Sequence, residues 1–199
     1  MSWIVVLIRR VIQALLPTRD KAPRKQETLR SDSGSPTIEV ALYQSKNLEA
    51  ARGRTPEQVL AQYLAQAIEQ AGFDYKIRYG FSQTFDPPRS DNSVENFRWW
   101  ANESPEYATH SNLLLYDSRG GGRAAVGGKN GIVGMNQVKR LTDETKAVCP
   151  SDQCGNMWAG IHELGHNLGG RHSTPMMQDK PTMLFHPNMV GLLREKYGN

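Results

Sequence analysis

The residues best suited to chemistry lie close together in the segment MWAGIHELGHNLGGRH, at 157–172. His162 and His166 are four positions apart, so on a helix their imidazoles would lie on one face, a single turn from each other. Gly169 would let the chain leave that helix through a conformation that a β-carbon disfavours, which turns His172 back toward the same point. Three imidazoles with a fourth position left open are the ligand set of a catalytic zinc ion, Zn²⁺. The spacing therefore predicts one zinc site formed by His162, His166 and His172.

Glu163 directly follows the first of these histidines. From there it would take a proton from a zinc-bound water as a general base, without occupying a coordination position. The alternative is that the three histidines are ordinary surface or core residues. A chance match to the whole pattern H-E-x-x-H-x-x-G-x-x-H is far rarer than a match to H-E-x-x-H alone. The metal interpretation is therefore favoured, with Glu163 as the catalytic residue.

The long motif resembles the zinc signature of the metzincins, a clan of endopeptidases that includes the matrixins, adamalysins and astacins. Ser173 and the closing VGLLREKYG look most like the matrixins, whereas HELGHNLG also suits the adamalysins. The resemblance implies an α/β (α+β) catalytic domain with a twisted, mostly parallel sheet, an antiparallel edge strand, an active-site helix and a methionine turn beneath the metal. The order of elements over residues 37–199 is compatible with this plan, and the detailed resemblance covers residues 110–199.

The methionine turn implied by the resemblance is assigned to Met183, in the sequence PTMLFHP. Met176 and Met177 are alternatives, but Met176 follows His172 by only four residues, which leaves little chain to loop under the zinc. Any of these methionines would also suit a hydrophobic core. In the metzincins the chain after the turn forms the wall of the pocket for the substrate residue beyond the cut bond. The residues implied here are Phe185, His186, Pro187 and Asn188.

A second substrate-binding segment is implied upstream, where DSRGGGRAAV at 117–126 resembles the glycine loop and edge strand of the matrixins. An edge strand has free backbone N–H and C=O groups, to which an extended peptide can add as a further strand. The resemblance therefore implies that a peptide or protein substrate pairs with Ala124, Ala125 and Val126. Asp117 is a candidate ligand for a calcium ion, Ca²⁺.

The distribution of charge argues against a nucleic-acid partner. The 199 residues carry a formal net charge of +4, but residues 1–30 contain seven Lys and Arg against two acidic residues. The remaining chain holds 17 basic and 18 acidic residues and is nearly neutral, whereas a domain that binds nucleic acid usually has a strong basic patch. With 38% hydrophobic residues, the chain has enough apolar material for one core.

The sequence divides into three parts. Residues 1–16 have apolar positions three and four apart, with Arg9 and Arg10 on the other side, which predicts an amphipathic helix. This helix lies in a membrane interface, acts as an atypical export signal or packs on the protein's own body; the first two place the protein at a membrane or outside the cell. Residues 17–36 are polar and charged and predict a linker, and residues 37–199 form the metzincin-like domain.

The pattern of apolar residues predicts an alternation of strands and helices within the domain. Strands are expected at 37–44, 74–83, 111–118, 123–126 and 131–135, with a helix at 55–72. A polar loop containing Trp99 and Trp100 is expected between the second and third strands. Cys149 and Cys154 form either one short disulfide before the active-site helix or two reduced thiols.

These features together predict a zinc-dependent endopeptidase that hydrolyses peptide bonds through a zinc-bound water activated by Glu163. One alternative is a non-enzymatic zinc-binding or membrane-associated interaction module on a metzincin scaffold. Glu163 argues against that alternative, because a binding module has no use for a general base. A zinc hydrolase that acts on a non-peptide amide is a third possibility.

Overall fold

The computed structural model describes most of the predicted domain. It covers residues 25–46, 48, 56–88, 93–105, 108–117, 122–135, 155–173, 175–177 and 183–198. The amphipathic helix predicted at 1–16 and the alternatives for Cys149 and Cys154 lie outside the described residues and stay predictions.

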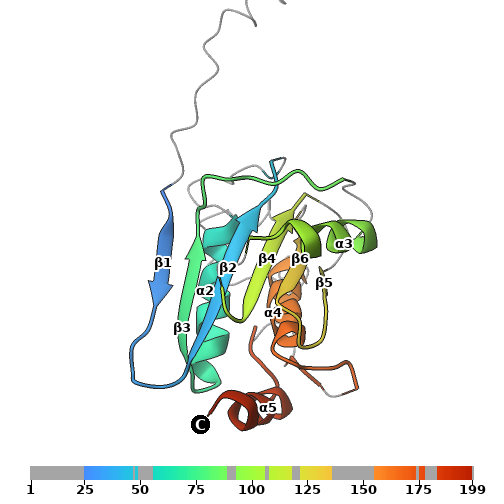
Figure 1. The fold of residues 1–199 in the computed structure, drawn as a ribbon. Helices are drawn as coiled ribbons and strands as arrows, with labels where there is room; N and C mark the ends of the chain where they lie inside the picture. The colour runs from blue at the N-terminus through green and yellow to red at the C-terminus, as the bar shows by residue number, and fades with distance from the viewer. Residues whose placement is uncertain are drawn as a thin grey trace, which may run out of the picture.

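A six-stranded mixed sheet forms the centre of the described structure, in the order β1-β3-β2-β4-β6-β5 (Figure 1). The strands are β1 (Glu27–Arg30), β2 (Thr37–Gln44), β3 (Asp74–Tyr79), β4 (Ser111–Tyr116), β5 (Gly122–Ala124) and β6 (Asn130–Gly134). The described helices are α2 (Pro56–Gln70), α3 (Ser93–Glu103), α4 (Gly155–Asn167) and α5 (Pro187–Tyr197). Strand β2 is parallel to β3 and β4, and β4 is parallel to β6. The predicted α/β class is therefore confirmed.

Different helices cover the two faces of the sheet (Figure 1). In β4, Leu113 and Leu115 belong to the core that α2 and α4 form on one face. Leu114 points to the other face, where it belongs to a second cluster with Trp100 of α3. Burial on both faces explains why the strand has the continuous apolar run LLL rather than an alternating pattern.

The structure differs from the linker predicted at 17–36, because residues 27–30 form strand β1. This strand pairs antiparallel with β3, and Leu29 packs against the main core. The turn after it is anchored by Asp74, whose carboxylate accepts hydrogen bonds from the backbone N–H groups of Ser33, Gly34 and Ser35. Backbone pairing stabilises a polar strand of this kind, and hydrophobic periodicity does not reveal it.

The polar loop predicted around Trp99 and Trp100 contains helix α3 instead. The fully buried ring of Trp100 packs against Tyr43 and Phe85, with centroid distances of 5.2 and 4.9 Å. Its Nε1 donates a hydrogen bond to the backbone oxygen of Asn112 at 3.2 Å. Tryptophan has only moderate helix propensity, so packing against the sheet accounts for a helix that local sequence did not indicate.

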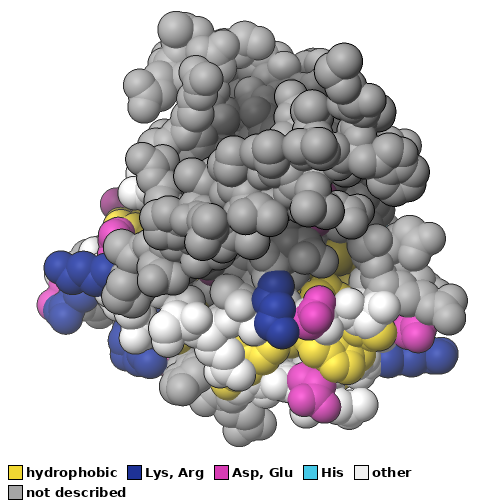
Figure 2. Space-filling model, turned by 90° about the horizontal axis from the view of Figure 1, so that it is seen from above, with side chains coloured by type: hydrophobic (Ala, Val, Ile, Leu, Met, Phe, Trp, Pro, Cys, Tyr) yellow, Lys and Arg dark blue, Asp and Glu magenta, His cyan; other side chains and the backbone are white. Residues whose placement is uncertain are grey.

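The described surface carries charges of both signs. Seen from above, Lys and Arg side chains lie beside Asp and Glu side chains, around hydrophobic side chains (Figure 2). This mixture agrees with the nearly neutral charge of residues 31–199. Among the described helices, none combines the length and the apolar character needed to cross a membrane.

Candidate functional site

Helix α4 carries the first two histidines of the motif and ends in a Schellman cap. The N–H of Gly170 donates to the carbonyl oxygen of Gly165, and the N–H of Gly169 donates to that of His166, both at 2.9 Å. Gly169 has a φ of +112°, in the region that favours glycine. The turn predicted at Gly169 is therefore confirmed, and it leads the chain back toward His172.

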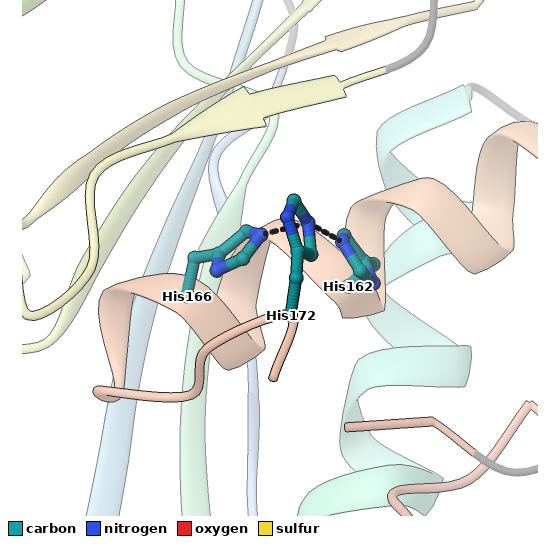
Figure 3. Close-up of side chains that lie close together, drawn as sticks. All are labelled: His162, His166 and His172. Atoms are coloured by element: carbon teal, nitrogen blue, oxygen red, sulfur yellow. Dashed lines mark hydrogen bonds between the residues drawn. The ribbon is translucent and has the colours of Figure 1, made fainter. Parts of the chain in front are cut away.

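The three histidine rings of the motif converge on one point (Figure 3). Nε2 of His172 lies 3.1 Å from Nε2 of His162 and 3.0 Å from Nε2 of His166. Four-coordinate zinc with nitrogen ligands at 2.0–2.1 Å separates those nitrogens by about 3.3 Å, close to the observed spacing. These residues form a group that could hold a metal ion, with ligand atoms within 4.8 Å of one another. The identity of the metal stays a prediction.

The surroundings of the histidines favour the neutral imidazoles that metal binding requires. Nδ1 of His166 donates to the carbonyl oxygen of Gly170 at 2.9 Å, which leaves the lone pair on Nε2 facing His172. Burial lowers the pKa of His162 to about 4, with smaller effects from the imidazoles of His166 and His172. Burial also lowers the pKa of His166, although its hydrogen bond with Gly170 opposes the shift. This donor set fits a divalent cation of the zinc type.

Trp158, one helical turn before His162, is part of the site and was missed by the sequence analysis. Its indole stacks on the His162 ring at a centroid distance of 5.0 Å and an interplanar angle of 21°. The ring of His172 also stacks on His162, at 5.3 Å and 21°. Both contacts restrict the orientation of His162. The spacing of four residues between Trp158 and His162 was the available signal, because it places both side chains on one helix face.

Glu163 is buried in α4, directly after His162, and only 4% of it is exposed. Within the described residues, its Oε2 atom has no hydrogen-bond partner. Burial raises the pKa of Glu163 from 4.5 to about 8, against the opposing effect of the Arg123 guanidinium. A divalent cation nearby would also oppose the rise, because an opposite charge favours the ionised carboxylate. A buried carboxyl group with one unpartnered oxygen suits a group that accepts a proton from water.

The raised pKa of Glu163 predicts how the stability of the metal-free protein depends on pH. The group favours the folded state at pH values below about 4.5, and its contribution is lost as the pH rises through about 8. Glu163→Gln removes this titration, so we expect the metal-free variant to lose less stability than the wild type between pH 5 and pH 9. Thermal unfolding of both proteins across that range, in the presence of chelator, measures the difference. Parallel curves would contradict the burial of an ionisable Glu163.

Gly122, at the start of β5, makes room for the Glu163 carboxyl group. A β-carbon at Gly122 would lie 2.3 Å from Cγ and 2.5 Å from Oε1 of Glu163. Both distances are far below the contact distance of about 3.5 Å between non-bonded carbon atoms. The sequence shows Gly122 only as one of several adjacent glycines, because its contact with Glu163 exists only in the folded protein.

Gly122→Ala is expected to displace the Glu163 carboxyl group. Any activity that depends on this group should fall by a factor of about 100, because moving a catalytic group by 1 Å can cost that much. The zinc content should stay at the wild-type level, because the histidines are not touched. The rate of peptide cleavage and elemental analysis measure these two quantities. Gly191→Ala is the matched control, since a β-carbon there meets no atom within 4 Å. Unchanged cleavage by Gly122→Ala would contradict the positioning role.

Strand β5 is the last strand in the sheet order and lies next to α4. It pairs antiparallel with β6, as expected for the edge strand. The N–H of Gly127 donates to the carbonyl oxygen of His166 at 2.8 Å, which fixes the turn after β5 on the end of α4. The strand ends at Ala124, and Ala125 and Val126 are exposed residues that follow it. Their contact with a substrate stays a prediction.

The residues assigned to the methionine turn and the pocket wall lie at the start of α5 and in the core before it. Met183 is buried and has a φ of +53°. Phe185 is fully buried, so its side chain faces the core and not solvent. His186 caps α5, because its Nδ1 accepts a hydrogen bond from the N–H of Asn188, and Pro187 begins that helix. Their roles beneath the metal and in the pocket stay predictions.

A cavity of about 110 Å³ lies between the segment that follows α4 and helix α5. Asn188, one of the residues assigned to the pocket wall, lines it together with Met176. The sulfur of Met176 lies against Gly170, in the turn that follows α4. A β-carbon added to Gly170 would be only 2.4 Å from that sulfur. Met176, the alternative to Met183 for the methionine turn, therefore contacts Gly170, the residue whose carbonyl orients His166.

Asp117 follows β4 and is partly exposed. Among the described residues, the side chains grouped closely enough to hold a metal are the three histidines of the motif. A calcium ion at Asp117 therefore stays a prediction.

Comparison with known proteins adds no assignment to this site. No protein-family model and no curated protein matches the sequence. The resemblance to the metzincins consequently rests on the motif.

Proposed function

We propose that the protein is a zinc-dependent endopeptidase of the metzincin type, with a matrixin-like or adamalysin-like catalytic domain. The observation that carries this proposal is the convergence of the Nε2 atoms of His162, His166 and His172 beside the buried Glu163. The parallel centre of the sheet and the antiparallel strand β5 beside α4 support it. Catalytic zinc sites use three protein ligands and leave one position open, which matches this donor set.

When bound, zinc at the three histidines would lower the pKa of a coordinated water toward about 7 and polarise the carbonyl of the scissile peptide bond. Glu163 accepts the proton of the attacking water and passes it to the leaving amine nitrogen. Gly122 leaves the space in which the Glu163 carboxyl group lies, and the Gly170 carbonyl fixes the ring of His166. The chain thus contributes a proton acceptor and an ordered set of three ligands.

An extended peptide is the substrate that suits strand β5. The strand is the last in the sheet order, so a peptide can add to it through backbone hydrogen bonds. The turn after β5 is tied to α4 at His166, which holds the strand beside the metal ligands. Backbone pairing of this kind binds many sequences. We propose that His186, Pro187 and Asn188, which are at least partly exposed, add selectivity for the residue beyond the cut bond.

Digestion of a broad peptide library by the full chain, with and without chelator, tests the proposal. We expect cleavage of internal peptide bonds that stops when zinc is removed and returns when zinc is added. Stoichiometric zinc binding without any cleavage would contradict the proposal and favour a non-enzymatic zinc-binding module. Hydrolysis confined to non-peptide amides would contradict it in favour of another class of zinc hydrolase.

We propose that residues 1–16 attach the protein to a membrane surface, which would make it membrane-associated; as an export signal, the same segment would instead make the protein extracellular. Removing residues 1–24 should abolish co-sedimentation with anionic liposomes, because the predicted basic face is lost. Peptide cleavage should persist, because the truncation stops before strand β1. Equal sedimentation of the two forms would contradict the membrane role.

A further inference from the structure

Helix α5 contacts the turn that connects the first two histidines to the third. Lys196, in the last turn of α5, donates from Nζ to the carbonyl oxygen of Leu168 at 3.2 Å. Leu168 directly precedes Gly169, and its carbonyl belongs to the group that a helix leaves without intrahelical partners at its C-terminus. The same Nζ lies 3.3 Å from the position of a β-carbon on Gly169. The ammonium group of Lys196 therefore rests directly on the turn.

The charge of Lys196 suits this position. The C-terminus of a helix carries partial negative charge from its aligned peptide dipoles, and a cation there is stabilising. The Schellman cap satisfies the carbonyl groups of Gly165 and His166 through the N–H groups of Gly170 and Gly169. Lys196 adds a donor for the carbonyl of Leu168, which those two bonds leave out.

The side of the turn that faces α5 borders a cavity. Gly169, Gly170 and Arg171 border the cavity of about 110 Å³ between the turn and that helix. The sulfur of Met189 reaches the turn, since a β-carbon on Gly170 would lie 2.8 Å from it. Helix α5 therefore contacts the turn at two points, through Met189 beside the cavity and through the hydrogen bond from Lys196.

The end of α5 that carries Lys196 is itself anchored to the body of the protein. The ring of Tyr197 lies edge-on against His110, with centroids 5.3 Å apart. His110 in turn accepts a hydrogen bond at Nδ1 from the N–H of Glu39 in the central strand β2. The Nζ of Lys196 lies 4.9 Å from the centroid of the Tyr197 ring, which favours a cation over the ring face. Lys196 therefore connects the turn to the sheet.

We infer that Lys196 is a positioning residue of the metal site. Its hydrogen bond fixes the carbonyl of Leu168 and thereby the next two residues of the turn, Gly169 and Gly170. The carbonyl of Gly170 accepts the hydrogen bond that orients His166. His172 follows only two residues later, so the same turn sets where the third ligand lies. The inference rests on the metal site of the proposed function and does not depend on proteolysis.

The zinc affinity of the full chain, measured by competition with a chromogenic chelator, tests this role. Lys196→Met keeps an apolar stem but removes the donor, and we expect affinity to fall about tenfold, in the range seen when groups that orient metal ligands are removed. Lys196→Arg keeps a charged donor and should restore most of the affinity. Lys46→Met is the matched control, because Lys46 forms an exposed ion pair with Asp86 at 3.7 Å.

The visible spectrum of the cobalt(II)-loaded protein gives a second measurement that responds to ligand geometry. We expect it to change in Lys196→Met and to stay the same in Lys46→Met. Lower thermal stability of Lys196→Met with unchanged zinc affinity and an unchanged spectrum would show a purely structural role and overturn the inference. A wild type that binds zinc but cleaves no peptide would refute the endopeptidase proposal alone, and the Lys196 variants would still decide the inference.

Discussion

Glu163→Gln is expected to lower peptide cleavage by a factor of roughly 100 or more while the protein keeps its zinc. Positioned acid–base groups contribute about 10²- to 10⁴-fold to catalysis, and a glutamine side chain does not accept a proton from water. Its volume matches that of glutamate, so the loss would not come from a cavity beside Gly122. The rate constant kcat/KM for a peptide identified in the library digest, and elemental analysis of the same sample, measure the two effects.

Glu103→Gln is the matched control, because it makes the same chemical change at an exposed position at the end of α3. It should cleave at the wild-type rate. A Glu163→Gln variant that also cleaved at the wild-type rate would show that the motif marks the metal site but that the base lies elsewhere.

His172→Ala is expected to weaken zinc binding by a factor of about 100 or more. Removing an outer partner of a metal ligand commonly costs 10–100-fold in affinity, and loss of a ligand should cost at least as much. His172 lies at the centre of the group, because its Nε2 is within 3.1 Å of the corresponding atoms of both His162 and His166. Elemental analysis after dialysis measures the retained zinc.

Arg171→Ala is the control for His172→Ala, since Arg171 is the exposed neighbour in sequence and has no lone pair to offer a metal. It should retain one zinc per chain. Full zinc occupancy in His172→Ala would remove this histidine from the ligand set.

Periodicity predicted those elements whose stability comes from hydrophobic burial. The strand predicted at 37–44 has the same bounds in the structure, because its apolar residues face cores on both sides. Strand β1 was not predicted, since its polar residues are held by backbone pairing with β3. Helix α3 lies where the local sequence predicts a loop, because burial of Trp100 against the other face of the sheet stabilises the helix. Both omissions concern contacts between segments far apart in the sequence.

The residues of the candidate site also fall into two groups, those that local sequence predicts and those that only the fold reveals. Helical spacing and one glycine were enough to bring His162, His166 and His172 together, because these residues lie within a single short segment. Gly122 and Lys196 lie 41 and 33 positions from Glu163, and no local pattern relates them to it. Their contributions follow from where β5 and α5 lie against α4, which is a property of the folded chain.

The zinc-edge X-ray absorption spectrum of the zinc-loaded full chain tests the central claim most directly. The expected spectrum shows one zinc with three imidazole nitrogens at about 2.0–2.1 Å and one further light ligand, and two imidazoles when His172 is replaced by alanine. Three results would contradict a catalytic site at His162, His166 and His172. These are sulfur ligands from Cys149 and Cys154, a zinc coordinated by four protein side chains, and a chain that retains no zinc.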